Sequence, residues 1–187
     1  MKSTFIFPCL FLLIIGLLRF FETDWLYKNR LKGKKYAKWT LFGFNASYGL
    51  TIFITIIEYI LVKRKINIGV TIISVIMMII RLLLKLWASK TLGDYWSPHI
   101  EIKENHKLIK DGPYKYIRHP AYLGTIIDII AVALFLNSYY TLLLILLIRF
   151  SMVLIRIKIE EKILTDYFGE EYINYKKTTW ALVPKIF

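Results

Sequence analysis

Residues 122–155 read YLGTIIDIIAVALFLNSYYTLLLILLIRFSMVLI, and this stretch decides the fold. Two apolar runs, Tyr122–Leu136 and Tyr139–Ile155, are separated only by Asn137 and Ser138, which are uncharged and favour turns. A helix of about 20 apolar residues crosses the hydrocarbon core of a bilayer, and both runs approach that length. The spacing therefore predicts two membrane helices that lie side by side as a tight hairpin.

The N-terminal half carries longer apolar runs of the same kind. No segment alternates as a barrel strand does, and no low-complexity linker divides the chain. We therefore expect an all-α, polytopic integral membrane protein of about five transmembrane helices in a single domain, 1–187. Residues 1–89 supply three spans, and residues 90–187 supply a polar loop, the hairpin and a C-terminal helix. The three N-terminal runs are Phe5–Phe21, read as a retained span and not a signal peptide, Trp39–Val62 and Ile66–Ala88.

Composition favours lipid as the main solvent of this chain. Hydrophobic residues make up 57% of the sequence and charged residues 21%, an apolar share above that of ordinary soluble domains. The net charge of +13 falls in clusters between apolar runs, which argues against nucleic acid as a partner and for anionic membrane lipids. The single cysteine, Cys9, lies in the first apolar run, so no internal disulfide or Cys-rich zinc site can form.

The basic clusters also predict an orientation, because cytosolic loops of membrane proteins are enriched in Lys and Arg. Residues 28–38, residues 90–120 and the tail after Ile157 are basic, whereas the turn at Asn137 has no charge. We expect these basic segments and the C-terminal helix to be cytosolic and the N-terminus to lie outside. One segment disagrees, since Lys63-Arg64-Lys65 would then face outward.

Several ionisable residues are expected at membrane depth, where each needs a partner or a function. Asp128 precedes the hairpin turn by about as many residues as Arg149 follows it. The two side chains are therefore predicted to form a structural ion pair between the hairpin helices. Arg81 and Lys85 lie near the cytosolic end of their helix and are expected to extend to the lipid headgroups.

Two polar segments flank the hairpin and concentrate the reactive residue types. Residues 99–122 hold all three histidines together with several tyrosines in a segment shaped by Gly112-Pro113 and Pro120. Beyond the hairpin, Arg156 and Glu160 lie four residues apart and share a helical face. Phe168-Gly169 predicts the end of that helix. The histidine spacing does not fit a zinc site, so no metal is expected.

At these residues the sequence resembles the isoprenylcysteine carboxyl methyltransferase family. The matching segments are NHKLIKDGPYKYIRHPAYLG at 105–124 and RIKIEEKILTDYFGEEYINYKK at 156–177, in the family's order and separated by one helical hairpin. The resemblance implies a membrane enzyme that uses S-adenosylmethionine to methylate the carboxylate of a lipidic or prenylated substrate. The chain departs from the family at Thr178, where relatives have an arginine, which puts a contribution of the tail to substrate binding in doubt.

The resemblance also implies which residues form the site. Arg156 would hold the substrate and is the catalytic candidate. The residues that would hold the cofactor are His99, His106, Lys107, Leu108, Ile109, Tyr114, His119, Pro120, Ala121, Tyr122 and Glu160.

The residue types agree with this reading on chemical grounds. The chain has no Gly-x-Gly-x-x-Gly between a strand and a helix, so a Rossmann-type cofactor site is excluded. A nucleotide-like cofactor would instead be held by stacking on Tyr or His, by loop amides and by Glu160. A carboxylate acceptor is ionised at neutral pH and needs no general base, but it needs a cation such as Arg156 to position it.

Three alternatives remain open from the sequence. The acceptor could be a phospholipid amine, with His119 or Glu161 as the proton acceptor, or a lipid hydroxyl. A sterol-reductase-like enzyme would bind NADPH in a similar C-terminal region, although its pyrophosphate calls for more cations than Lys115 and Arg118. The third alternative is a membrane protein without enzyme activity whose histidines sense pH.

Overall fold

The computed structural model describes residues 3–184, with side chains described from Ile6 onward. The chain forms six α-helices, two short 3₁₀ turns and two three-residue strands in that range. In chain order these are α1 (Ser3–Lys28), β1 (Lys34–Tyr36), α2 (Trp39–Val62), α3 (Ile68–Leu92), η1 (Gly93–Tyr95), β2 (Ile100–Ile102), η2 (Gly112–Lys115), α4 (Pro120–Phe135), α5 (Tyr139–Phe168) and α6 (Glu170–Thr178).

Three helices, α1, α2 and α3, are long and apolar enough to cross a membrane. The predictions of a mostly helical fold and of a membrane protein are therefore confirmed. Helix α4 has 16 residues, which extend about 24 Å and fall short of a bilayer core of about 30 Å. Helix α5 has 30 residues and continues well past the predicted span. The expected number of about five spans stays a prediction.

The hairpin at Asn137 forms as its sequence predicts. Asn137 has a positive φ of 57°, a conformation that asparagine tolerates better than most residues. Its side chain donates to Leu134 O at 3.0 Å and accepts from Asn67 N at 2.6 Å, so the turn is tied to the start of α3. On the other side, Glu58 accepts hydrogen bonds from Thr141 N and Tyr140 N and so caps the first turn of α5.

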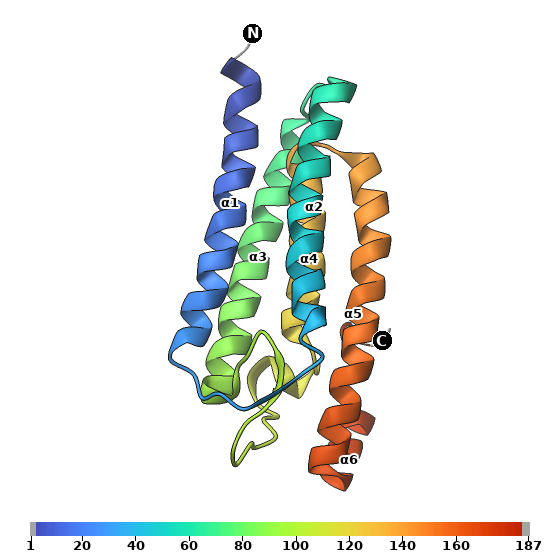
Figure 1. The fold of residues 1–187 in the computed structure, drawn as a ribbon. Helices are drawn as coiled ribbons and strands as arrows, with labels where there is room; N and C mark the ends of the chain where they lie inside the picture. Colours follow the sequence, from blue (N-terminus) through green and yellow to red (C-terminus); the bar gives the residue numbers. More distant parts are fainter. Residues whose placement is uncertain (1–2, 185–187) are drawn as a thin grey trace.

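The helices form an elongated bundle in which α3 packs along α4, and α2 packs across α4 and α5 (Figure 1). The core of the bundle contains Ile52 from α2, Met78 from α3 and Val132 from α4. Helix α1 stands at the edge and approaches α2 at Gly16, where a Cβ atom would lie 2.7 Å from Ile52 Cδ1. The two helices touch at this point, and cavities lie along α1 on the side of α3 and on the side of α2.

The polar segments that connect the helices around the predicted site all lie at one end of the bundle (Figure 1). The segments 29–38 and 93–119 and helix α6 gather there, whereas the turns at 63–67 and Asn137 lie at the opposite end. The basic segments 28–38 and 90–120 therefore share an end. Its orientation towards the cytosol stays a prediction.

Three expectations were wrong or incomplete, and the first two concern the strands and the hairpin. The all-α expectation missed the antiparallel pair β1–β2, whose register places Lys35 opposite Glu101. The predicted Asp128–Arg149 ion pair was wrong, because Asp128 pairs with Arg19 at 3.1 Å and Arg81 at 3.5 Å, whereas Arg149 turns towards α2. Depth along a hairpin does not determine which neighbouring helix a side chain faces.

Arg81 and Lys85 also have partners that the sequence analysis did not foresee. Arg81 Nη1 lies 2.6 Å from Glu22 Oε2, and Lys85 Nζ lies 3.4 Å from Glu22 Oε1. Both side chains are buried or nearly so. They therefore hold α1 against α3, and the expectation that they extend to headgroups was wrong.

Candidate active site

A cavity of about 730 Å³, including its open mouth, lies where the segment 92–119 meets the ends of α5 and α6. We call it the loop cavity. The described side chains and backbone that line it are those of Leu92, Tyr95, Ser97, His99, Ile100, Glu101, Ile102, His106, Lys107, Leu108, Ile109, Tyr114, Arg118, His119, Glu160, Ile163, Leu164, Phe168, Tyr172 and Tyr175.

The buried carboxylate of Glu101 shapes the wall of the loop cavity that β2 forms. It accepts hydrogen bonds from Tyr27 Oη at 3.0 Å, from Ser97 Oγ at 2.6 Å and from the backbone of Gly33. Burial raises the pKa of Glu101, but these hydrogen bonds outweigh burial, and the pKa is lowered. One ionised side chain thus joins α1, β1 and the segment that carries His99.

His106 forms an aromatic wall of the loop cavity. Its ring stacks on Tyr95 with the centroids 4.6 Å apart and the planes at 10°, and Phe168 meets it edge-on at 5.7 Å. His106 Nδ1 accepts a hydrogen bond from Lys103 N at 3.3 Å. Burial lowers the pKa of His106 to about 4, so the ring is neutral at physiological pH. A neutral aromatic stack of this kind suits a planar heterocycle.

Glu161 fastens the loop to the helices on the other side of the cavity. Its carboxylate lies 2.7 Å from Arg118 Nε, 2.7 Å from Lys176 Nζ and 3.4 Å from His119 Nε2. The backbone adds two hydrogen bonds, from Arg118 N to Trp180 O and from His119 N to Ala181 O. Arg118, α6 and the tail are therefore parts of the scaffold, and the tail supports the loop through its main chain.

A second and larger cavity, of about 2550 Å³ including its openings, lies between α1, α2, α4 and α5. We call it the lipid cavity because its walls are mostly apolar and belong to the bundle. Ser97 and His99 line both cavities, so the two spaces adjoin at the segment before β2. Ala121, Tyr122 and Arg156 line the lipid cavity.

Tyr122 connects the two residues that share a face of α5. Arg156 Nε donates to Tyr122 Oη at 2.7 Å, and Tyr122 Oη donates to Glu160 Oε2 at 2.5 Å. The remaining nitrogens of Arg156 donate to Thr40 Oγ1 and to Pro98 O. Arg156 thus faces the lipid cavity and Glu160 faces the loop cavity, with one phenol between them.

The structure brings most of the sequence-predicted cofactor residues to one cavity and separates the rest. Pro120 begins α4 and lines neither cavity, whereas Ala121 and Tyr122 lie on the lipid side. The predicted residues that line the loop cavity are His99, His106, Lys107, Leu108, Ile109, Tyr114, His119 and Glu160.

Sequence reasoning missed other lining residues, and one group of them carried a signal. Ile163, Leu164 and Phe168 follow Glu160 at helical spacing on α5, so the face that holds Glu160 could have been extended to them. Glu101 had no such signal, because its place depends on the pairing of β1 with β2, and Tyr95 is placed by its stack on His106 and its hydrogen bond to Asn105 O. In residues 3–184 no three His, Cys, Asp or Glu side chains gather as metal ligands.

The fold and the two adjoining cavities define an integral membrane protein with a cavity of polar and aromatic walls beside a larger, mostly apolar cavity within the bundle. A family model described as the isoprenylcysteine carboxyl methyltransferase (ICMT) family matches residues 71–166, about half of the chain. The chain belongs to this family.

Similar proteins include an uncharacterised protein, YpbQ, of Bacillus subtilis, which is 33% identical over 85 residues, covering 46% of this chain and 51% of that protein. The protein-S-isoprenylcysteine O-methyltransferase of Schizosaccharomyces pombe is 33% identical over 96 residues, covering 50% of this chain and 41% of that enzyme. The corresponding enzyme of Saccharomyces cerevisiae is 34% identical over 101 residues, covering 53% and 42%. The chain thus spans about half the length of these relatives or less.

The fold is also similar to the solved structure of the eukaryotic intramembrane Ras methyltransferase ICMT. The TM-score is 0.69 with 24% sequence identity, and the match covers 75% of this chain and 53% of that protein. This likeness establishes a shared fold.

Proposed function

We propose that this protein is an S-adenosylmethionine-dependent methyltransferase that methylates the carboxylate of a lipidic or prenylated acceptor. The observation that carries the proposal is the meeting of the two cavities at Ser97 and His99, with Arg156 on the lipid side and Glu160 on the loop side. Names of the similar proteins support the same reading. The site would face the cytosol, where the polar cofactor is dissolved.

The residues of the loop cavity fit this cofactor. His106 and Tyr95 offer an aromatic stack for adenine. Two buried polar atoms of the cavity wall, His99 Nδ1 and Tyr172 Oη, have no hydrogen-bond partner in the described residues and are available to a ligand. Glu160, with 26% of its side chain exposed, is available to an ammonium or a ribose hydroxyl.

When bound, S-adenosylmethionine would supply a methyl group on a sulfonium; an ionised carboxylate can attack that methyl carbon in line without a general base, and the C–S bond electrons leave with the sulfur as neutral S-adenosylhomocysteine. The protein's contribution is alignment and exclusion of water. Arg156 positions the acceptor carboxylate, because its guanidinium offers a planar fork and the structure gives it neutral partners only. Tyr122 fixes the distance between Arg156 and Glu160.

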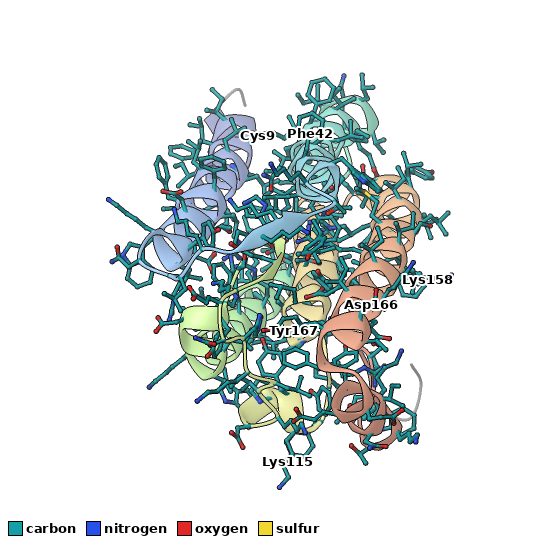
Figure 2. All side chains as sticks on the ribbon, turned by 60° about the horizontal axis from the view of Figure 1, so that its bottom comes forward. Cys9, Phe42, Lys115, Lys158, Asp166 and Tyr167 are labelled. Atoms are coloured by element: carbon teal, nitrogen blue, oxygen red, sulfur yellow. The ribbon has the colours of Figure 1, made fainter. Side chains whose placement is uncertain are left out.

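The alternative acceptors and cofactor have weaker support. A nicotinamide dinucleotide needs cations for its pyrophosphate, but Arg118 is bound to Glu161, and Lys115 extends away from the body of the molecule (Figure 2). A phospholipid amine needs a proton acceptor, and both candidates are engaged: Glu161 has three partners, and His119 lies 3.4 Å from Glu161 and 3.7 Å from Glu160.

The proposal predicts separate roles for Glu160 and Arg156. In purified protein in detergent, calorimetry should detect binding of S-adenosylmethionine and none of NADPH. Glu160→Ala should weaken cofactor binding about tenfold or more, because it removes a charge-assisted contact. Arg156→Lys should keep cofactor affinity within about threefold and lose most methyl transfer from labelled cofactor to an S-prenylated cysteine, since an ammonium cannot replace the fork.

A prenylated cysteine whose carboxyl is already esterified is the matched control substrate and should accept no methyl group. Binding of NADPH in place of S-adenosylmethionine would overturn the cofactor assignment. Equal loss of cofactor binding in both variants would overturn the division of roles.

A further inference from the structure

Arg149 is a buried cation of α5 that has no carboxylate within ion-pair distance in the part of the chain that the structure describes; the carboxylate of Asp128, which acts on it from further away, pairs with Arg19 and Arg81. Arg149 lies two helical turns before Arg156, and only 4% of its surface is exposed. Its Nη1 donates to Phe44 O at 2.9 Å and to Ser47 Oγ at 2.7 Å, both neutral acceptors. Its Nε is buried and has no hydrogen-bond partner among the described residues. Arg149 also lines the lipid cavity.

Three other cations of the lipid cavity, Arg19, Arg81 and Lys85, each pair with a carboxylate, whereas Arg149 does not. Arg19 and Arg81 both bind Asp128, at 3.1 and 3.5 Å. Arg81 and Lys85 also bind Glu22, at 2.6 and 3.4 Å. This network joins α1, α3 and α4, and none of its carboxylates pairs with Arg149.

Arg149 and Arg156 share one aromatic neighbour. Their Cζ atoms lie 4.1 and 5.0 Å from the centroid of the Phe44 ring, which limits their separation to about 9 Å. Neither guanidinium forms an ion pair with a carboxylate in residues 6–184, so two buried positive charges lie beside one ring with neutral hydrogen-bond acceptors around them. Such an arrangement is costly at membrane depth unless an anion enters the space beside them.

We propose that Arg149 is a second ligand-contacting residue of the lipid cavity and that it selects acceptors by their negative charge. The inference rests on the proposed function and deepens it. An ionised carboxylate of a lipid is attracted by both guanidiniums, whereas an amine headgroup is repelled. Methylation converts the carboxylate into a neutral ester, so the product loses this attraction and is released to the bilayer.

The test measures selectivity with simple lipids of one chain length, followed by the stability of the protein in detergent. Oleate, methyl oleate and oleylamine serve as the probes for an anion, its neutral ester and a cation. We expect oleate to bind the wild-type protein at least about tenfold more tightly than either of the others. Equal affinity for oleate and methyl oleate would overturn the proposal.

Arg149→Met separates a ligand-binding role from a structural one. We expect it to reduce oleate affinity about tenfold and to abolish the preference over methyl oleate. It should also raise the melting temperature of the ligand-free protein, because an unpaired buried cation is replaced by a side chain of similar volume. No acceptor loses its only partner, since Phe44 O also accepts from Ser47 Oγ. Arg149→Lys should keep part of the selectivity.

Arg30→Met is the matched control, because Arg30 lies outside both cavities and pairs only loosely with Asp94, at 4.0 Å. It should leave the oleate preference unchanged. If Arg149→Met lowers the melting temperature and leaves the oleate preference within threefold of wild type, Arg149 is structural and the proposal is wrong. S-adenosylmethionine affinity, measured in parallel, reports separately on the proposed function and should not change in Arg149→Met.

Discussion

Glu160 and Glu161 are adjacent in the sequence, but they serve different purposes in the structure. Glu161 is surrounded by Arg118, His119 and Lys176 and has only 12% of its side chain exposed. Glu160 turns to the neighbouring face of α5 and reaches the loop cavity. The rotation of about 100° per residue in a helix therefore divides a scaffold carboxylate from a ligand-facing one.

At this scale the structure predicts how stability depends on pH. Burial raises the pKa of Glu161, but hydrogen bonds from His119, Lys176 and Arg118 outweigh it and lower the pKa to about 2. A carboxylate with a lowered folded-state pKa stabilises the protein above its unfolded pKa, about 4.3, and loses this contribution as the pH falls towards 2. Glu161→Gln should therefore lower the free energy of unfolding at pH 7 by about 1–3 kcal/mol, allowing for solvent screening. It should also reduce the fall of the melting temperature at acidic pH, which we call the acid limb.

The control is Glu171→Gln, since Glu171 forms an exposed pair with Lys110 at 2.7 Å. Loss of this pair should lower the free energy of unfolding by less than about 1 kcal/mol and leave the acid limb unchanged. An unchanged acid limb in Glu161→Gln would mean that this carboxylate does not hold the loop.

Among the elements, the smallest ones position the site. Strands β1 and β2 have three residues each, yet their pairing places Glu101 beneath the loop cavity. Gly33 comes just before β1 and lies very close to the end of β2. A Cβ atom added to Gly33 would lie 2.1 Å from Ile102 O and 2.7 Å from Lys103 Cα. These are backbone atoms, which cannot move away as a side chain can. Glycine is required here by close approach.

Gly33→Ala should separate β1 from β2 and release Glu101 from the Gly33 amide. We expect a lower melting temperature and a loss of S-adenosylmethionine affinity of about tenfold, measured by calorimetry in detergent. Gly49→Ala is the matched control, because Gly49 lies within α2 and a Cβ there would meet nothing within 4 Å. Similar behaviour of the two variants would show that the strand pair does not support the cofactor site.

The sequence predicts the elements whose causes are local. The turn at Asn137, the end of α5 at Gly169 and the full extent of α2 depend on turn residues and apolar length, and all three agree with the structure. The partner of Asp128 could not be predicted, because it depends on how α1 and α3 pack beside the hairpin. The strands are equally non-local, since β1 and β2 are separated by two long helices.

The same distinction applies to the candidate site. Motif residues such as His106 and Glu160 were predictable from their resemblance to a family, and the structure places both at the loop cavity. Arg149 was recognised as a membrane-depth charge but assigned the wrong neighbour. Its lack of a carboxylate within ion-pair distance is a property of the assembled bundle and could not be read from the hairpin alone.

For the whole molecule, the distribution of charge bears on its orientation in the membrane. The basic triplet Lys63-Arg64-Lys65 lies at the end of the bundle opposite the site. Because Lys and Arg collect on the cytosolic side, this triplet argues against a cytosolic site if each of its charges is given equal weight. Arg64, however, lies 3.9 Å from Glu58, donates to Asn137 O and covers the rings of Tyr139 and Tyr140. Because Arg64 has these partners within the protein, its charge is a weaker argument against a cytosolic site.

We therefore expect the end of the bundle that carries the loop cavity to be cytosolic and the turn at 63–67 to lie outside. In a Cys9→Ser background, Lys115→Cys and Lys65→Cys each introduce a single thiol at one end of the bundle. In intact cells a membrane-impermeant maleimide should label Lys65→Cys, and it should label Lys115→Cys only after permeabilisation, because the reagent cannot cross the bilayer. Labelling of the Cys9→Ser parent gives the background, and retained binding of S-adenosylmethionine checks the fold of each variant. The reverse pattern would place the loop cavity on the side that lacks a supply of cofactor, and the proposed function could not operate there.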